Sequence, residues 1–167
     1  MAIIPEAVYE TVEKKLRQRQ SMIRKAEEAL ARAKAKATDI SAPSGRRYSG
    51  KGGKPGSRTE RGAIILMKAE KRVETARAWE AVFREMDRIY PPEDSNEGFV
   101  ASMIYGNGIS QAELARITGC SRQTIRLRQD RYVIRTAFVA ALAGLIGKGV
   151  NGEDGGADQT VRGAETD

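Results

Sequence analysis

The sequence predicts an all-α protein, and three observations support this class. Residues 7–37 contain neither Gly nor Pro and consist largely of Ala, Glu, Lys, Arg and Gln, which are strong helix formers. Segment 61–89 repeats apolar residues every three or four positions and ends before Pro91 and Pro92. Segment 110–132 contains the capping residues and the turn glycine of two consecutive helices.

Composition narrows the possible functions. The 167 residues carry a net charge of +7, with no His and a single Cys. Metal sites, His-dependent catalysis and disulfide frameworks therefore lack their usual residues, and we expect no enzyme activity, no cofactor and no bound metal. The positive charge favours an anionic partner, with nucleic acid as the leading class. Segments 41–60 and 121–147 each carry +4, so we expect the basic surface to be concentrated there.

The chain shows no targeting or membrane segment. Its N-terminal residues lack the basic region and apolar stretch of a secretory signal. The longest apolar run, 132–146, has 15 residues and contains Arg135, which makes it too short and too polar for a membrane span. We therefore expect a cytoplasmic protein that does not contact a membrane.

The predicted N-terminal helix, within the unit 1–37, has an apolar stripe with coiled-coil spacing. The stripe is interrupted by Arg19 and consists of Tyr9, Val12, Leu16, Ile23, Ala26, Leu30, Ala33 and Ala37. As a straight helix it would extend roughly 45 Å. Its partner is either the helix at 65–90 or a second copy of the chain in a homodimeric coiled coil.

Residues 38–60 have the composition of a flexible linker. They are rich in Gly and in basic residues and contain two Pro, so they cannot bury enough surface to fold alone. Their glycines do not form a phosphate-binding loop, because none precedes Lys-Ser or Lys-Thr. The segment is either a solvated linker or a cationic strap along a DNA backbone. The strap residues would be Arg46, Arg47, Lys51, Lys54 and Arg58.

The second long helix carries its own apolar stripe. This stripe consists of Ile65, Ala69, Val73, Ala76, Trp79, Phe83, Met86 and Tyr90. We interpret Trp79 as a core residue rather than one that stacks on a ligand. Ser95 or Asp94 is expected to cap a short helix ending near Tyr105, and the glycines that follow force a turn.

Segment 110–132 has the pattern of a helix-turn-helix. Ser110 and Glu113 form a capping box at the start of its first helix. Leu114 and Ile117 are expected to supply the inward face of that helix. The pattern therefore predicts two short helices held against one core.

The turn of this motif contains Gly119 and Cys120, the latter interpreted as a small buried hydrophobe. Ser121 caps the second helix, and Ile125, six residues after the glycine, anchors it. We therefore predict that residues 61–147 form a helical DNA-binding domain.

The second helix carries side chains suited to base recognition. Arg can donate two hydrogen bonds to guanine, Gln can pair with adenine, and Thr can contact the thymine methyl group. Arginines further along, Arg135 included, suit phosphate contacts. With double-stranded DNA as the partner, the predicted DNA-binding residues are Ser121, Arg122, Gln123, Thr124, Arg126, Arg128 and Arg131. A solvated basic helix would explain the arginines but not the cap, the turn and the anchor.

The apolar pattern continues from Tyr132 to Ile146, so this helix is predicted to run for roughly 40 Å. The helix at 61–90 or a second protomer would have to cover it. Residues 148–167 are Gly-rich and acidic and lack an apolar stripe, which predicts a disordered tail.

The segment GISQAELARITGCSRQTIRLRQDRYV resembles region 4 of bacterial sigma factors and, more closely, the bacteriophage late-transcription regulators of the RinA and ArpU type. The order of helices extends the resemblance over residues 8–147, but only 110–132 is motif-specific. One position departs from the pattern: the second apolar anchor, three residues after Ile125, is Arg128, with Leu127 beside it. The sequence leaves open which of these two residues faces DNA.

The resemblance implies a phage-encoded, sequence-specific transcription regulator, an activator of late or packaging genes. It would act with host RNA polymerase in the bacterial cytoplasm, and a homodimer would fit this role. Two alternatives remain, an antiterminator-like protein that binds RNA polymerase and a small terminase-like packaging subunit. The order of parts disfavours the packaging subunit, because that family places its DNA-binding domain before its assembly region.

Overall fold

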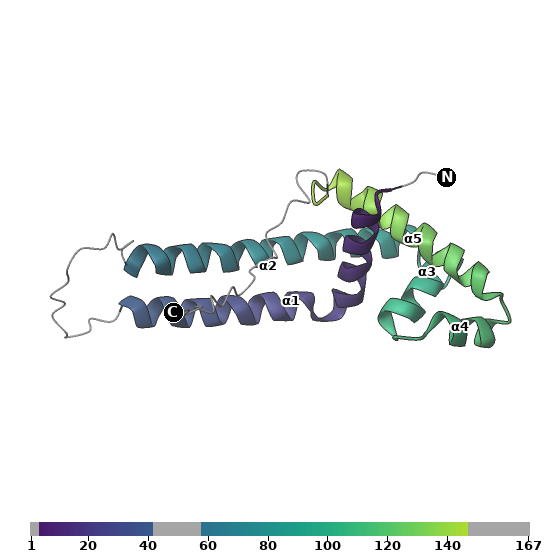
Figure 1. The fold of residues 1–167 in the computed structure, drawn as a ribbon, viewed down its shortest axis with the longest axis horizontal. Coiled ribbons are helices and arrows are strands. Elements are labelled where there is room, and N and C mark those ends of the chain that lie inside the picture. The colour runs from purple at the N-terminus through teal and green to yellow at the C-terminus, as the bar shows by residue number, and fades with distance from the viewer. Residues whose placement is uncertain (1–3, 42–57, 147–167) are drawn as a thin grey trace, which may run out of the picture.

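The computed structural model describes residues 4–41 and 58–146, and this part of the chain is helical without strands. Two long helices, α1 (Glu6–Ser41) and α2 (Arg58–Ile89), form an antiparallel hairpin (Figure 1). The predicted all-α class with long N-terminal helices is confirmed.

The remaining elements gather at one end of this hairpin and form a head (Figure 1). They are helix α3 (Asn96–Ala101), the π-helical turn η1 (Ser102–Gly106), α4 (Gln111–Thr118) and α5 (Arg122–Leu142). Ser95, one of the two predicted caps, begins α3 by accepting a hydrogen bond from the Gly98 N–H at 3.2 Å. The far end of the hairpin extends away from the head.

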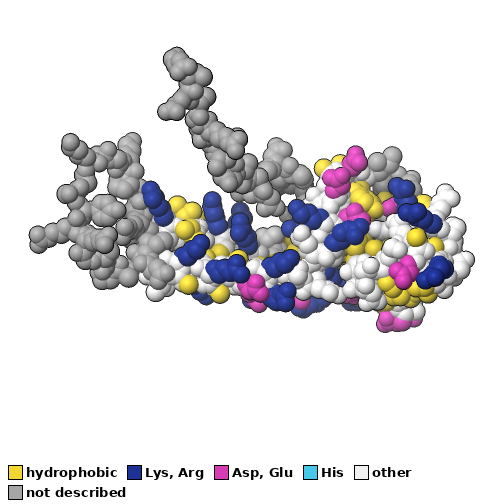
Figure 2. Space-filling view, turned by 60° about the horizontal axis from the view of Figure 1, so that its bottom comes forward, with side chains coloured by type: hydrophobic (Ala, Val, Ile, Leu, Met, Phe, Trp, Pro, Cys, Tyr) yellow, Lys and Arg dark blue, Asp and Glu magenta, His cyan; other side chains and the backbone are white. Residues whose placement is uncertain are grey.

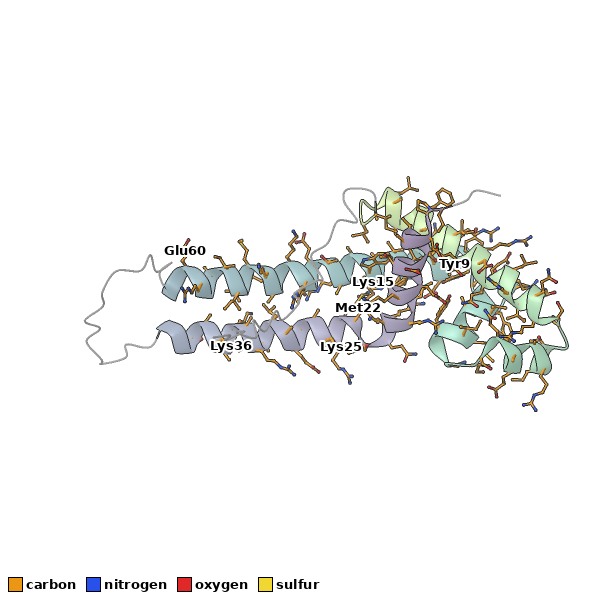
Figure 3. The ribbon with its side chains drawn as sticks, in the orientation of Figure 1. Tyr9, Lys15, Met22, Lys25, Lys36 and Glu60 are labelled. Atoms are coloured by element: carbon orange, nitrogen blue, oxygen red, sulfur yellow. The ribbon has the colours of Figure 1, made fainter. Side chains whose placement is uncertain are left out.

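Helix α1 bends near its middle. Figure 3 places Tyr9 and Lys15 on a first arm that crosses the head, and Lys25 and Lys36 on a second arm that runs along α2. Between the arms, the Ser21 hydroxyl donates to a backbone carbonyl of the preceding turn at 3.3 Å, a contact that favours helix bending. The straight helix predicted from the sequence is therefore replaced by two arms with different partners.

The apolar stripe of α1 is covered within the chain. Val12 and Leu16 on the first arm are buried in the head, and Ala33 on the second arm is buried in the hairpin. Arg19 interrupts the stripe and forms two hydrogen bonds with the Asp87 carboxylate of α2. Of the two predicted partners for this stripe, the one observed is a helix of the same chain. The stripe therefore does not require a homodimer, which stays a separate prediction.

The main core lies where α1, α2, α3 and α5 meet. It consists of Val12, Leu16, Trp79, Val82, Phe83, Met86, Ala101, Tyr132, Val133, Ala137 and Ala140. Trp79 is 3% exposed, and its ring centroid lies 5.8 Å from that of Phe83, so its predicted core role is confirmed. A smaller cluster joins α3, η1, α4 and α5 through Val100, Ile104, Leu114 and Ile125.

Several predicted boundaries differ from the structure. The hairpin helices enter the predicted linker 38–60, because α1 continues to Ser41 and α2 begins at Arg58. Ile65 was predicted in the buried stripe of α2 but is 40% exposed, because the far end of α2 has only α1 beside it. The rest of the linker and the predicted tail lie outside the described residues.

Helix α5 ends earlier than predicted. It stops at Leu142 rather than near Ile146, and Gly144 follows with a left-handed φ of +72°. Its inner face packs on α1, α2 and α3, whereas Phe138 and Leu142 on the other side are exposed. No helix in the described ranges is long and apolar enough to cross a bilayer.

Candidate nucleic-acid interface

Helices α4 and α5 begin at the two serines predicted to cap them. The Ser110 hydroxyl accepts a hydrogen bond from the Glu113 N–H at 3.2 Å. The Ser121 hydroxyl accepts one from the Thr124 N–H at 3.0 Å. Each cap satisfies a backbone donor that the first turn of a helix leaves free, so both predicted caps are confirmed.

Gly119 sets the turn between the two helices. Its φ of +68° is left-handed, and α4 ends there as predicted. The Thr118 hydroxyl donates to the Leu114 carbonyl at 2.8 Å and accepts from the Cys120 N–H at 3.4 Å, which closes the turn. Cys120 is half-buried rather than buried, because it lies in this turn with one side on the smaller core cluster.

Two apolar anchors hold the motif together. Leu114 of α4 and Ile125 of α5 are both 0% exposed, as predicted. Ile117 was predicted to face inward, but it is 57% exposed. The inward face of α4 instead follows Leu114, Ala115 and Thr118, and Ile117 lies to its side. The sequence prediction for Ile117 was therefore wrong.

The first two turns of α5 present three of the predicted base-reading side chains to solvent. Arg122, Gln123 and Arg126 are exposed. Thr124 is half-buried, and its hydroxyl shares a hydrogen bond with the Ser121 hydroxyl at 2.8 Å. The exposed Arg126 guanidinium lies 4.0 Å from the half-buried Asp130 carboxylate, a long contact at the surface that costs little to separate. The three exposed side chains are thus free to contact a ligand.

Leu127 and Arg128 lie on different sides of α5. Leu127 is 43% exposed and is therefore not a second anchor. Arg128 is half-buried, with a guanidinium nitrogen 4.0 Å from the Cys120 sulfur in the turn. The buried line that begins at Ile125 continues instead through Gln129 and Tyr132. Of the two residues left open by the sequence, Leu127 is the outward one.

Arg131 and Arg135 both approach Glu97 in the first turn of α3. Their guanidinium nitrogens lie 3.8 Å and 3.6 Å from the Glu97 carboxylate. Arg135 also lies over the Tyr90 ring, 4.5 Å from its centroid. Arg135 therefore has an intramolecular role, whereas the Arg131 side chain remains 56% exposed at the surface.

A buried polar residue, Gln129, connects the motif to α1. It is 3% exposed, and its amide nitrogen donates to the Tyr105 hydroxyl at 2.8 Å and to the Glu13 carboxylate at 3.2 Å. Its amide oxygen accepts from Gln111 at 2.6 Å. Burial raises the pKa of the Tyr105 hydroxyl. Sequence reasoning missed Gln129, although its position four residues after Ile125 places it on the buried line.

Arg116 is a second residue that sequence reasoning missed. It is exposed in the last turn of α4, and it is the single basic residue between positions 93 and 120. In helix-turn-helix proteins the first helix crosses the DNA backbone, where such a cation is useful. Of the predicted strap residues, Arg46, Arg47, Lys51 and Lys54 lie outside the described residues, and Arg58 is the first residue of α2.

Comparison with known proteins leaves the fold and this surface as the basis for a functional assignment. No protein-family model matches the chain, and no curated protein or solved structure shows significant similarity to it. The described residues define an all-α protein in which two short-linked helices, α4 and α5, are joined by a turn at Gly119.

Proposed function

We propose that this protein is a sequence-specific DNA-binding transcription regulator. The observation that carries the proposal is the N-terminal end of α5, where Arg122, Gln123 and Arg126 are exposed while the buried Ile125 anchors the helix on its inner side. Arg and Gln side chains form paired hydrogen bonds with purine edges in the major groove. A recognition helix reads bases through its N-terminal residues, so this end of α5 is suited to direct readout.

The finer proposal follows from the resemblance of residues 110–132 to phage late-transcription regulators. We propose a phage-encoded activator of late or packaging genes that acts with host RNA polymerase in the bacterial cytoplasm. Double-stranded DNA is its partner, and a palindromic target would indicate that the regulator binds as a dimer.

The test begins with unbiased selection of bound fragments from phage or prophage DNA. The selected site and a random duplex are then compared for the wild type, for Arg122→Ala with Arg126→Ala, and for a control with Arg84→Ala and Arg88→Ala. Loss of the α5 pair should reduce discrimination by roughly 1 to 3 kcal/mol for each base that is no longer contacted. The control removes the same charge from α2 and should retain discrimination. Full discrimination by the α5 variant would contradict the proposal.

A second candidate function is supported by two exposed apolar side chains on the same motif. Ile117 of α4 is 57% exposed and Leu127 of α5 is 43% exposed. Such residues favour a protein-binding surface, as in an antiterminator-like protein that binds RNA polymerase. Capture of purified RNA polymerase without DNA, abolished in Ile117→Ser with Leu127→Ser but retained in the arginine variant, would support this function. No capture by the wild type would exclude it.

A further inference from the structure

The helical hairpin carries two straight rows of exposed cations that the helix-turn-helix does not use. One row lies on the second arm of α1 and consists of Lys25, Arg32 and Lys36. The other lies on α2 and consists of Arg61, Lys68 and Arg72. Each row has the spacing i, i+7 and i+11. Because a helix advances about 100° per residue, this spacing returns each side chain to nearly the same line.

The two rows lie on the same face of the hairpin. On α1 the packed line passes through Ala33, and on α2 it passes through Ala69 and Val73. Each row is displaced from its packed line by about a quarter to a third of a turn in the same rotational sense. Since the helices run antiparallel, equal displacement brings both rows to one side. Figure 2 looks onto this side and shows Lys and Arg side chains in two rows along the hairpin.

The opposite side of the hairpin has a different balance of charge. By the same helical geometry, Glu27, Glu70 and Glu74 lie there together with two cations, Lys34 and Arg77, so the charges on that side nearly cancel. On the basic side, Glu28 is the acidic neighbour, and it lies 4.0 Å from Arg32. The other five cations of the two rows have no ion pair within the described part of the chain. The hairpin therefore has a positive surface on one side, and most of its cations have no carboxylate partner in the described part of the chain.

The dimensions of this surface fit an extended polyanion. Eleven residues of helix make each row about 16 Å long, and packed helices lie about 8 to 10 Å apart. A metabolite needs a concave site, whereas two rigid, separated rows suit the regularly spaced phosphates of a duplex. Amphipathic membrane-binding helices instead place large apolar side chains beside their cations. On this face the large apolar residues beside the α2 row are Ile65, within it, and Ile64 at its edge, 40% and 43% exposed.

We propose that this basic face of the α1–α2 hairpin binds the phosphate backbone of duplex DNA without reading its sequence. Figure 2 shows further Lys and Arg side chains on the head in the same view, so the positive surface continues beyond the hairpin. The hairpin contact adds affinity for any duplex, whereas the helix-turn-helix is proposed to supply the choice of site. The two contacts use different residues and can fail independently.

The experiment measures binding to a random 30-base-pair duplex over a range of salt concentrations. The test variant combines Lys25→Gln, Lys36→Gln, Lys68→Gln and Arg72→Gln. The matched control combines Lys14→Gln, Lys34→Gln, Arg84→Gln and Arg88→Gln, which removes the same charge from exposed positions outside the two rows. Gln is a good helix former, so both variants should keep their helical circular dichroism.

The test variant is expected to bind at least tenfold more weakly at low salt. The slope of log Kobs against log salt should become shallower by about 0.9 for each phosphate that is no longer neutralised, up to about 3.6 for the four substitutions. The slope of the control should change by less than about 0.9, the value for one phosphate. A charge-preserving variant, with each Lys replaced by Arg and Arg72 by Lys, should bind as the wild type does, which separates charge from folding.

Three results would overturn the proposal. The first is a test variant that has the same affinity and salt slope as the control. The second is a charge-preserving variant that binds as weakly as the test variant. In the third case, duplex binding would be unchanged while binding to phosphatidylserine vesicles was abolished, which would assign the face to a membrane. Arg122→Ala with Arg126→Ala should leave most of the salt slope intact, so failure of the proposed site-reading function is distinguishable from failure of the hairpin contact.

Discussion

The Tyr9 hydroxyl donates a hydrogen bond of 2.6 Å to the Asp130 carboxylate, across 121 positions of the chain. Tyr9 lies on the first arm of α1, and Asp130 lies in α5 beside Arg126. Burial and the Asp130 carboxylate together raise the pKa of the Tyr9 hydroxyl, so the tyrosine stays protonated and able to donate. This bond ties the N-terminal arm to the helix proposed to read DNA.

Removal of this hydrogen bond should destabilise the fold. Tyr9→Phe should lower the free energy of unfolding by about 1.5 to 3 kcal/mol, the range for a hydrogen bond to a charged group. Urea denaturation measures the difference. Tyr90→Phe is the matched control, because the Tyr90 hydroxyl has no hydrogen bond within the described ranges. Equal stability of Tyr9→Phe and the wild type would show that the bond contributes nothing net.

The anchor role of Ile125 can be separated from simple apolar content. Ile125→Ala creates a cavity at a fully buried site and should lower the free energy of unfolding by about 2 to 5 kcal/mol. Ile117→Ala removes the same atoms from a side chain that is 57% exposed, and it should change the free energy of unfolding by less than about 0.5 kcal/mol. Both values come from chemical denaturation. Similar costs at the two positions would mean that Ile117 is also buried in solution.

The turn glycine should resist substitution for a conformational reason. Gly119 has a left-handed φ, and an added Cβ would meet nothing within 4 Å, so the cost of Gly119→Ala is backbone strain of about 1 to 2 kcal/mol. Gly106→Ala is the control, because its Cβ would make only an ordinary contact with Ser102 at 3.8 Å. Thermal melting should separate the two variants. An Ala at position 119 that costs no more than one at 106 would argue against the left-handed turn.

Stability should fall at alkaline pH. Tyr132 is 2% exposed, and burial raises its pKa from about 10 to about 12. Below pH 10 the tyrosine is protonated in both states and its full contribution is present. As the pH rises through this window the unfolded state loses its proton first, so about 2 to 3 kcal/mol of stability is lost by pH 12. Denaturation at several pH values between 10 and 12 measures how steeply the free energy of unfolding falls with pH. Tyr132→Phe should make this fall less steep, and a steeper fall in that variant would contradict the assignment.

Local rules explain why much of this molecule could be predicted from its sequence. The Ser110 and Ser121 caps, the Gly119 turn and the Pro91 boundary depend on neighbours within four residues. The burial of Trp79 and Ile125 followed from their places in periodic stripes. These features need no knowledge of which helix packs against which.

The features that could not be predicted depend on contacts between distant parts of the chain. Ile117 was misplaced because three-residue spacing alone does not show which side of α4 meets α5. In the sequence, Arg19 only interrupts an apolar stripe. The structure shows that it pairs with the Asp87 carboxylate of α2. Gly98 carried no sequence signal, yet a Cβ there would collide with the Tyr90 carbonyl oxygen. The pairing of the two cation rows likewise depends on how α1 and α2 face each other.

The bend in α1 has a consequence for the order in which the protein folds. The second arm meets α2, which follows it closely in the chain, whereas the first arm packs into a core that is complete only when α5 joins α2 there. Contacts of short sequence separation form early and those of long separation form late. We therefore expect the hairpin to form while the ribosome is still making the head, with α5 fixed in place last. An incomplete chain would then already display the basic hairpin face before α5, the helix proposed to read DNA, had docked.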